Sequence, residues 1–309
     1  MLKVGVIGAG RMGQIRALAA RDLGAAVVVV CDSEEDRARD LAKRVGAHAV
    51  VEVTAVRMDE LDALFLCTPP SVREIGAMAI KSGVHLLVEK PLGLSTKACE
   101  PLIQALDSRP VITAVGYMNR YRPSVLQVRA SLAEETPIGI TANWFGGRYS
   151  VPWWSDPEQS GGPINEQCTH LVDICRYLIG EILSVQAFVS NGVNIAEAEA
   201  AAAILKFEND VLGTLLYSCK ASEKLVELQA YTAHRTLCLK GWDFRLPEDN
   251  KQTLDKNAIF TIEVRNFLNS IITGESNKIR SDLRDAFRTQ RVVDAILEAA
   301  SDGQEVEVK

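Results

Sequence analysis

The sequence predicts a two-part α/β protein. A doubly wound parallel sheet is expected in residues 1–118, and an α/β domain with a large, mostly antiparallel sheet in residues 119–309. In the first part, short runs rich in β-branched residues alternate with helix-like segments, a pattern typical of parallel sheets covered on both faces. After residue 118, strand-like runs follow one another across short turns, which indicates antiparallel pairing. The length of 309 residues also suits about two domains.

The first part contains five strand-like and four helix-like segments. The expected strands cover 2–7, 26–31, 63–67, 84–88 and 111–115, and the expected helices 11–23, 34–45, 71–82 and 95–108. Ser71 is placed to cap the third of these helices. In sheets of this kind ligands bind beyond the carboxyl ends of the strands, so every strand end here is a candidate site.

The second part begins with a helix-like stretch at 123–133, a strand at 136–147 and a turn-rich segment at 146–163. A strongly helical stretch, 164–179, follows. Five strand-like runs are expected next, and then two closing helices. The strands cover 182–191, 199–208, 211–219, 224–232 and 235–241, and the helices 259–273 and 282–300.

Composition and charge exclude several classes of protein. The net charge is −6 and there is no basic block, so nucleic acid is not an expected partner. The longest clear apolar run, 25–31, is far shorter than the ~20 residues of a membrane helix, and the start lacks a signal-peptide pattern. Seven scattered cysteines fit a reducing compartment rather than a disulfide framework or zinc site. We therefore expect a soluble, cytoplasmic protein.

The glycine turn Gly8-Ala-Gly10-Arg11-Met12-Gly13 joins the first expected strand to the first expected helix. This context is the one that dinucleotide binding requires. Gly8 would permit the tight turn, Gly10 the close approach of a pyrophosphate, and Gly13 close packing of helix on strand. The helix start at Arg11 and Met12 would offer N–H groups to the phosphates. The alternative is a tight turn that binds nothing.

Asp32 follows the second strand, 19 residues after Gly13, where a carboxylate can accept hydrogen bonds from both ribose hydroxyls. The same carboxylate would repel a 2′-phosphate, and Glu34, Glu35 and Asp36 add to its charge. The predicted cofactor is therefore NAD in preference to NADP. Arg37 is the residue that could reverse this preference.

Two further strand ends carry candidate residues. Thr68 and Pro69 follow the third strand, and Glu89-Lys90-Pro91 follows the next. The nicotinamide is expected near Thr68, Pro69 and Lys90. A lysine there could donate a hydrogen bond to a substrate oxygen or move a proton, although its ordinary pKa of about 10.4 is high for a base near neutrality. The alternative is a surface Glu–Lys pair before a turn.

The helix expected at 164–179 carries Glu166, His170 and Asp173 at positions i, i+4 and i+7, hence on one face. Three ionisable groups beside apolar neighbours are costly unless that face lines a polar cleft. Histidine is the natural proton donor or acceptor near neutral pH. A buried structural histidine and a metal site are the alternatives, but no other histidine or cysteine pattern supports a metal, so none is expected.

The order of these motifs resembles the Gfo/Idh/MocA oxidoreductases. The motifs are GAGRMG, CTPP at 67–70, EKP at 89–91, GYMNRYRP at 116–123 and SGGP…H…D at 160–173. The resemblance implies a Rossmann domain and a second domain whose large sheet commonly packs against a partner subunit. A homodimer or homotetramer is thus expected. The resemblance also implies hydride transfer between NAD(P) and a carbinol carbon of a sugar, cyclitol or related polyol.

By this resemblance Lys90 matches the family's active-site lysine, His170 the catalytic histidine and Asp173 a substrate-binding acid. Glu166 stands where many members have Asp, and the start Glu-Gln-x-Thr-His also occurs in the family. Arg73 stands where many members have His. As hydride leaves the substrate, His170 would take the hydroxyl proton and Lys90 would stabilise the alkoxide. Which of the two is the base stays open.

Three further residues are candidates for substrate contact. Tyr117 and Arg120 follow the last strand of the first part, and Trp153 precedes the helix at 164–179, where its ring could stack on a sugar. Trp153 could equally belong to a subunit contact. Two other functions stay open: an NAD-dependent glycosidase that oxidises its substrate transiently, and a non-catalytic NAD-binding sensor or assembly protein. The identity of the substrate does not follow from the sequence.

Overall fold

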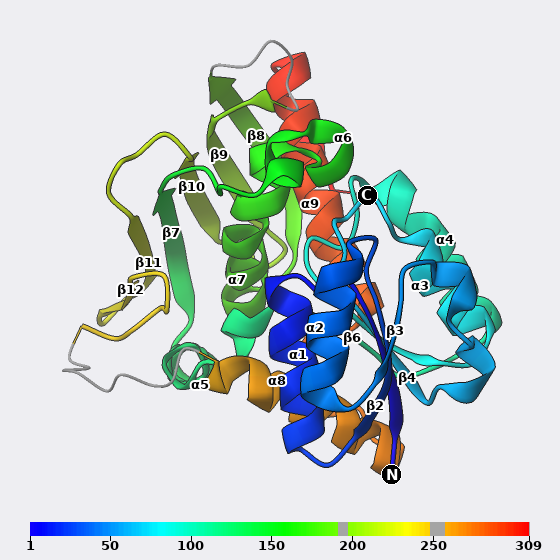
Figure 1. The fold of residues 1–309 in the computed structure, drawn as a ribbon. Coiled ribbons are helices and arrows are strands. Elements are labelled where there is room, and N and C mark those ends of the chain that lie inside the picture. The colour runs from blue at the N-terminus through cyan, green and yellow to red at the C-terminus, as the bar shows by residue number, and fades with distance from the viewer. Residues whose placement is uncertain (191–196, 248–256, 309) are drawn as a thin grey trace. The chain divides into compact units, whose positions relative to one another are not determined.

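The computed structural model describes residues 1–190, 197–247 and 257–308, which form two compact units (Figure 1). The first unit contains Met1–Gly93, Lys97–Met118 and residues 257–286. The second contains Leu94–Thr96 and residues 119–247 and 287–308. One change of unit falls after residue 118, where the sequence suggests the domain boundary. However, residues 257–286, which the sequence analysis assigns to the second domain, belong to the first unit.

The first unit is built on six parallel strands in the order β3-β2-β1-β4-β5-β6. This confirms the doubly wound parallel sheet, with the strand order reversing between β1 and β4. The three-residue β3 was not expected, because its side chains are largely exposed and its sequence lacks an apolar run. The strands are β1 (Lys3–Ile7), β2 (Ala26–Cys31), β3 (His48–Val50), β4 (Ala63–Leu66), β5 (His85–Val88) and β6 (Thr113–Val115).

Helices cover both faces of this sheet. On one face α1 (Arg11–Asp22), α2 (Glu35–Val45) and α8 (Ala258–Thr273) share a core with alternate strand residues such as Val6 and Phe65. On the other face α3 (Glu74–Lys81) and α4 (Thr96–Ser108) pack close to the sheet at Gly76. Helix α8 belongs to this unit because its apolar residues Val264, Phe267 and Leu268 complete the core beside α1.

Helix α3 begins three residues later than predicted. Residues 69–72 form a turn in which the Val72 N–H donates to the Pro69 carbonyl (3.1 Å), and Arg73 takes the N-cap position without a side-chain cap. Ser71 therefore does not cap the helix. The two prolines ahead of it favour a turn over an early helix start.

The second unit is built on seven strands in the order β12-β11-β7-β10-β9-β8-β13. All neighbouring strands pair antiparallel except β7 and β10, which pair parallel. The expected large, mostly antiparallel sheet is thus confirmed. The strands are β7 (Pro137–Phe145), β8 (Ile182–Ser190), β9 (Ala200–Phe207), β10 (Leu212–Ser218), β11 (Leu225–Thr232), β12 (Thr236–Lys240) and β13 (Val306–Glu307).

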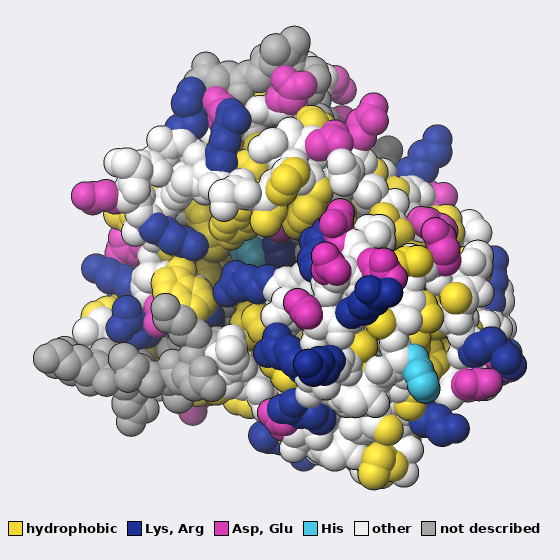
Figure 2. Space-filling model, viewed as in Figure 1, with side chains coloured by type: hydrophobic (Ala, Val, Ile, Leu, Met, Phe, Trp, Pro, Cys, Tyr) yellow, Lys and Arg dark blue, Asp and Glu magenta, His cyan; other side chains and the backbone are white. Residues whose placement is uncertain are grey.

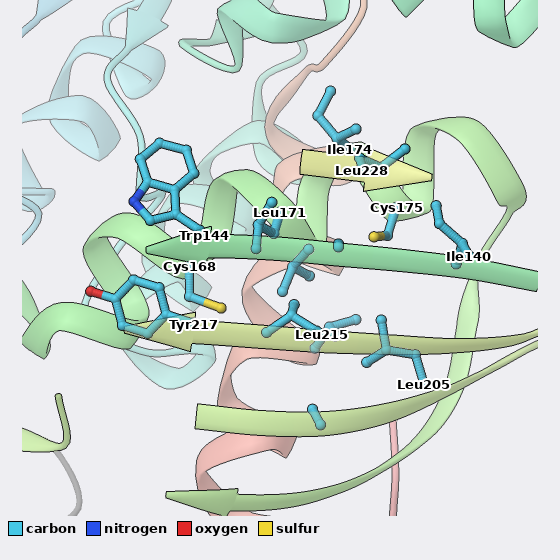
Figure 3. Close-up of a cluster of buried hydrophobic side chains, with 14 of the residues drawn as sticks. Ile140, Trp144, Cys168, Leu171, Ile174, Cys175, Leu205, Leu215, Tyr217 and Leu228 are labelled. Atoms are coloured by element: carbon cyan, nitrogen blue, oxygen red, sulfur yellow. The ribbon is translucent and has the colours of Figure 1, made fainter. Parts of the chain in front are cut away.

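One face of this sheet is covered by helices. These are α5 (Pro123–Glu134), α7 (Thr169–Ile179) and the part of α9 (Leu283–Asp302) that follows residue 286, while the short α6 (Pro157–Ser160) lies in the turn-rich segment. Figure 3 shows apolar side chains packed between α7 and the strands, including Ile140, Leu171, Ile174, Leu205 and Leu215.

A π-helical turn, Ile164–Cys168, precedes α7. The sequence predicts one continuous helix over 164–179, whereas the structure divides this stretch into two helical types. Glu166 lies in the π-helical turn, and His170 and Asp173 lie in α7, so ideal α-helical spacing does not hold across all three residues. Single π-helical turns occur frequently at functional sites.

The other face of the seven-stranded sheet carries exposed apolar side chains. Residues alternate between buried and exposed along β9 and β10. We call the exposed apolar residues Phe188, Ile204, Leu212 and Leu216 the open-face patch; their exposure ranges from 42% to 70%. None of the helices in the described part of the chain has the length and hydropathy that a membrane-spanning segment requires.

Candidate active site

The turn between β1 and α1 has the geometry that its glycines require. Gly8 has a φ of +92°, and a Cβ there would lie 2.6 Å from the Cys67 carbonyl oxygen. A Cβ at Gly13 would overlap the carbonyl oxygen of Gly8, whereas a Cβ at Gly10 would meet no atom within 4 Å. The space beside Gly10 is therefore open where α1 begins at Arg11. This arrangement fits a pyrophosphate against the helix start.

Alanine substitutions at two of these glycines should separate packing from ligand binding. Gly13→Ala is expected to lower the free energy of unfolding by about 1–3 kcal/mol, because its Cβ overlaps a backbone oxygen. Gly10→Ala should change stability by less than about 0.5 kcal/mol. It should nevertheless weaken NADH binding about tenfold or more, a loss of about 1.4 kcal/mol. Thermal unfolding and NADH fluorescence titration measure the two effects, and unchanged NADH affinity in Gly10→Ala would contradict the assignment.

Asp32, directly after β2, is fixed by main-chain hydrogen bonds. Its two carboxylate oxygens accept from the N–H groups of Ala9 (2.7 Å) and Glu34 (2.9 Å). The half-exposed Arg37 lies 3.6 Å from Asp32 and 3.5 Å from Glu34. Figure 2 shows basic and acidic side chains interspersed over α2, which begins beside these residues. The carboxylate is thus held beside the glycine turn, and Arg37 lies between two acids.

The turn after β4 holds Thr68 and Pro69, both half-buried. The buried Arg73 donates from Nη1 to the carbonyl oxygens of Thr68 (3.4 Å) and Pro69 (3.0 Å) and to Thr68 Oγ1 (3.3 Å). The turn that the sequence assigns to the nicotinamide is therefore held by a residue one turn further along the chain. Arg11 is exposed and Met12 half-buried at the start of α1.

The Glu89-Lys90-Pro91 segment follows β5, and its Lys90–Pro91 peptide bond is cis. Lys90 is half-buried, whereas Glu89 is buried and accepts a hydrogen bond from Arg16 Nε (2.8 Å). Arg16 Nη1 also lies 2.5 Å from a carboxylate oxygen of Glu263 in α8. Burial disfavours the charge of Arg16, but the carboxylates of Glu263 and Glu89 outweigh this and raise its pKa.

His170, in the first turn of α7, is buried against an aromatic ring. Its imidazole stacks on the indole of Trp144 in β7, with ring centroids 5.9 Å apart and planes within 7°. The Lys224 ammonium lies 4.7 Å from the centroid of the same indole. This packing fixes the plane of the imidazole.

The tandem tryptophans before α7 have different surroundings. Trp154 is fully buried and donates from Nε1 to a carboxylate oxygen of Glu166 (2.8 Å). Trp153 is half-buried and packs at the margin of the second unit's core. Glu166 is therefore positioned by Trp154, while Trp153 keeps exposed surface.

Asp173 and Arg120 are brought together in the second unit. Arg120 Nε lies 3.0 and 3.1 Å from the two Asp173 oxygens, and Nη2 lies 2.6 Å from one of them. Thr289 Oγ1 also lies 3.3 Å from Asp173, and the guanidinium stands 4.9 Å from the Tyr177 ring centroid. Both ionic groups are buried. The sequence treats them as separate substrate contacts, whereas the structure pairs them.

Tyr117 lies in the first unit and is almost fully buried. Sequence reasoning missed Trp144, Arg16 and Glu263, and it considered Trp154 only as a neighbour of Trp153 that could stack on a sugar or belong to a subunit contact. For Arg16 and Glu263 there was a signal, because each is a charged residue on the otherwise apolar face of a helix. For Trp144 there was none. In the described ranges, no cluster of three metal-ligating side chains occurs.

Comparison with known proteins agrees with this architecture. Residues 2–117 match the family described as "Oxidoreductase family, NAD-binding Rossmann fold", and residues 126–237 match the "GFO/IDH/MocA C-terminal domain". The fold and the glycine turn are those of an NAD-binding Rossmann unit, which is joined in this chain to a second unit built on a mostly antiparallel sheet. The chain belongs to the GFO/IDH/MocA oxidoreductase family, as its motifs suggest.

The curated relatives are sugar and cyclitol dehydrogenases. Levoglucosan dehydrogenase of Pseudarthrobacter phenanthrenivorans is 26% identical over 237 residues, which cover 69% of this chain and 59% of that protein. Inositol 2-dehydrogenase 2 of Saccharopolyspora erythraea is 27% identical over 334 aligned positions, covering 100% and 96%. scyllo-Inositol 2-dehydrogenase (NAD(+)) of Bacillus subtilis is 31% identical over 193 residues, covering 60% and 56%. Two of these alignments thus span less than two thirds of the relative.

Among solved structures, levoglucosan dehydrogenase in complex with NADH superposes with a TM-score of 0.85. The sequence identity is 19%, and the match covers 100% of this chain and 99% of the other. At this identity the likeness establishes the fold across both units.

Proposed function

We propose that this chain is a dehydrogenase that transfers a hydride between NAD and a carbinol carbon of a sugar, cyclitol or related polyol. The observation that carries the proposal is the open space beside Gly10, next to the fixed carboxylate of Asp32, in a chain of this oxidoreductase family. The names of the curated relatives, levoglucosan and inositol dehydrogenases, support the substrate class.

The roles of the residues follow from their chemistry. When bound, the nicotinamide cofactor supplies the hydride acceptor. Lys90 donates a hydrogen bond to the substrate oxygen and stabilises its developing negative charge, and His170 exchanges the hydroxyl proton. The indole of Trp144 supports this role by holding the imidazole plane. Such proton transfer contributes ~10²–10⁴-fold in rate.

The remaining candidates divide into two groups. We propose Glu166, Trp153 and Tyr117 as substrate contacts, with Glu166 held in place through its hydrogen bond from Trp154. Asp173 and Arg120 bind one another, and we assign them a shared role in fixing α7, which carries His170.

Net redox turnover tests the function. Purified protein is mixed with NAD or NADP and a panel of inositols, aldoses, levoglucosan, sugar acids and sugar phosphates, and absorbance is followed at 340 nm. A dehydrogenase accumulates NADH with one class of polyol. An NAD-dependent glycosidase instead releases free sugar from glycosides without net formation of NADH. A sensor binds NADH but neither accumulates NADH nor releases sugar. Either of those outcomes would refute the proposal.

Asp32 is expected to set the preference for NAD. Asp32→Ser should lower kcat/KM for NAD about tenfold or more, because the ribose hydroxyls lose a charged acceptor worth about 1.5–3 kcal/mol. The same change frees Arg37 from one of its two acids, so kcat/KM for NADP should rise. The double variant Asp32→Ser/Arg37→Ala is the control and should not gain NADP activity. A preference that stays unchanged in Asp32→Ser would contradict the assignment.

We also propose that the open-face patch joins subunits into a homo-oligomer. Four large apolar residues exposed on adjacent strands support an interface, since monomers rarely leave such patches uncovered. Ile204→Glu should shift the molar mass measured by light scattering towards 33.7 kDa. Ile272→Glu is the control, at an apolar residue of α8 that is 69% exposed, more than the 50% of Ile204. A monomeric parent protein would refute the proposal.

A cytoplasmic location is proposed as well. None of the seven cysteines, all of which lie in the described ranges, forms a disulfide, and five of them are buried, which supports a reducing compartment. Cell fractionation that recovers the protein from an oxidising compartment would refute it.

A further inference from the structure

Two buried arginines of the first unit meet the Glu89-Lys90-Pro91 segment. Arg16 has no exposed surface, and Arg73 is 4% exposed. Removing a guanidinium from water costs several kcal/mol unless its partners compensate. The sheet and its helices could be built with apolar residues at both positions, so the burial of two charges requires a specific explanation.

Arg73 binds the main chain on both sides of Lys90. Its Nη2 donates to the carbonyl oxygens of Glu89 and Pro91, each at 3.0 Å, and its Nε donates to that of Leu92 at 2.7 Å. Burial lowers the pKa of Arg73 to about 10, so the group stays protonated at neutral pH. Because Nη1 holds the turn after β4, one guanidinium ties together the ends of β4 and β5.

Arg16 binds the side chain of Glu89. Its Nε and Nη2 each lie 2.8 Å from Glu89 Oε1, and Glu263 of α8 neutralises the other side of the guanidinium. Gly116 lies against the other oxygen of the Glu89 carboxylate, since a Cβ there would lie 2.6 Å from Glu89 Oε2. The carboxylate of Glu89 is therefore enclosed, and the residue next to Lys90 has little freedom to rotate.

We propose that Arg73 and Arg16 are positioning residues that together fix the direction of the Lys90 side chain. Arg73 sets the main chain before and after Lys90, and Arg16 prevents Glu89 from turning. This rests on the proposed function, in which Lys90 binds the reacting oxygen. A displacement of about 1 Å at such a group can cost 10²-fold in rate.

Arg73→Lys tests the proposal and keeps the charge. An ammonium presents its three donors from one nitrogen, whereas a guanidinium presents five in a fork, so lysine cannot reach both strand ends. The control is Arg109→Lys, at an exposed arginine that also donates to a carbonyl oxygen, that of Lys81 (3.0 Å). Both variants are first checked for cooperative unfolding.

Two readouts are measured. The first is the rate at which sulfo-NHS acetate acetylates Lys90, followed by mass spectrometry, with the exposed Lys3 and Lys97 as internal references. In Arg73→Lys this rate should rise at least about threefold, which corresponds to about 0.7 kcal/mol, because a less fixed Lys90 reaches the reagent more often. The second is turnover: kcat should fall about 10- to 10²-fold while KM for the polyol changes much less. Arg109→Lys should match the parent protein in both.

If Arg73→Lys does not fold, Arg16→Lys serves in its place, since lysine cannot bind Glu89 and Glu263 together as the guanidinium does. An acetylation rate at Lys90 that is unchanged or lower in a folded variant overturns the proposal. If the parent protein turns over no polyol, the proposed function fails, whereas the acetylation rates still decide whether the arginines fix Lys90.

Discussion

His170→Ala is expected to lower kcat by about 10²–10⁴-fold, the usual contribution of a positioned proton-transfer group. The NADH dissociation constant should stay within about threefold, less than 1 kcal/mol, because His170 is not among the residues assigned to the cofactor, which are those of the glycine turn and Asp32. Initial rates at 340 nm measure the first quantity, and NADH fluorescence titration measures the second.

His234→Ala is the matched control for this variant. His234 is exposed in the turn after β11, and its hydrogen bond to Thr232 is made by the main-chain N–H rather than by the imidazole. Both kcat and stability should therefore be unchanged. If His170→Ala retained the kcat of the parent protein, His170 would have no part in the chemistry and the proposed mechanism would be wrong.

Asp173→Leu is expected to destabilise the second unit by about 3–5 kcal/mol, because it leaves the buried guanidinium of Arg120 without its counter-charge. Arg120 lies over the Tyr177 ring, and the guanidinium carbon of Arg129 also lies 4.2 Å from the centroid of that ring. Removing Asp173 therefore leaves two cations beside one ring and takes away a neighbouring negative charge. Chemical denaturation measures the loss in the free energy of unfolding.

A double-mutant cycle separates a structural pair from a substrate contact. Arg120→Met alone should lower the free energy of unfolding by a similar amount, since it removes the guanidinium that pairs with the buried Asp173 carboxylate. The double variant Arg120→Met/Asp173→Leu should cost much less than the sum of the two, because no buried charge is left unpaired. Additive losses would show that the two residues are not coupled. A large rise in KM with unchanged stability in Asp173→Leu would instead make Asp173 a substrate ligand.

The sequence predicts those parts of the fold that depend on local pattern. β1, β2, β4 and β5 are mainly apolar runs, and β9 and β10 follow one another across the short turn at 208–211, so both sheets could be anticipated. The packing of α8 in the first unit could not be anticipated. Its amphipathic pattern shows that one face is buried, but not which of the two cores that face joins. The parallel pairing of β7 with β10 likewise depends on which distant strands meet.

The site divides in the same way. Gly8, Gly10, Gly13 and Asp32 are recognisable because one turn must satisfy several backbone constraints at fixed spacing. The partners of site residues come from remote segments: Trp144 from β7 lies on His170, and Arg120 pairs with Asp173. For Arg73, only the structure shows that its guanidinium spans two strand ends.

Direct hydride transfer from carbon is the central claim, and isotope transfer tests it. The polyol that yields NADH in the 340 nm panel is prepared with deuterium on its carbinol carbons and incubated with NAD and the protein. Mass spectrometry of the NADH formed should find one deuterium per nicotinamide. NADH that contains only protium, or no NADH with any polyol, would contradict the proposed dehydrogenase.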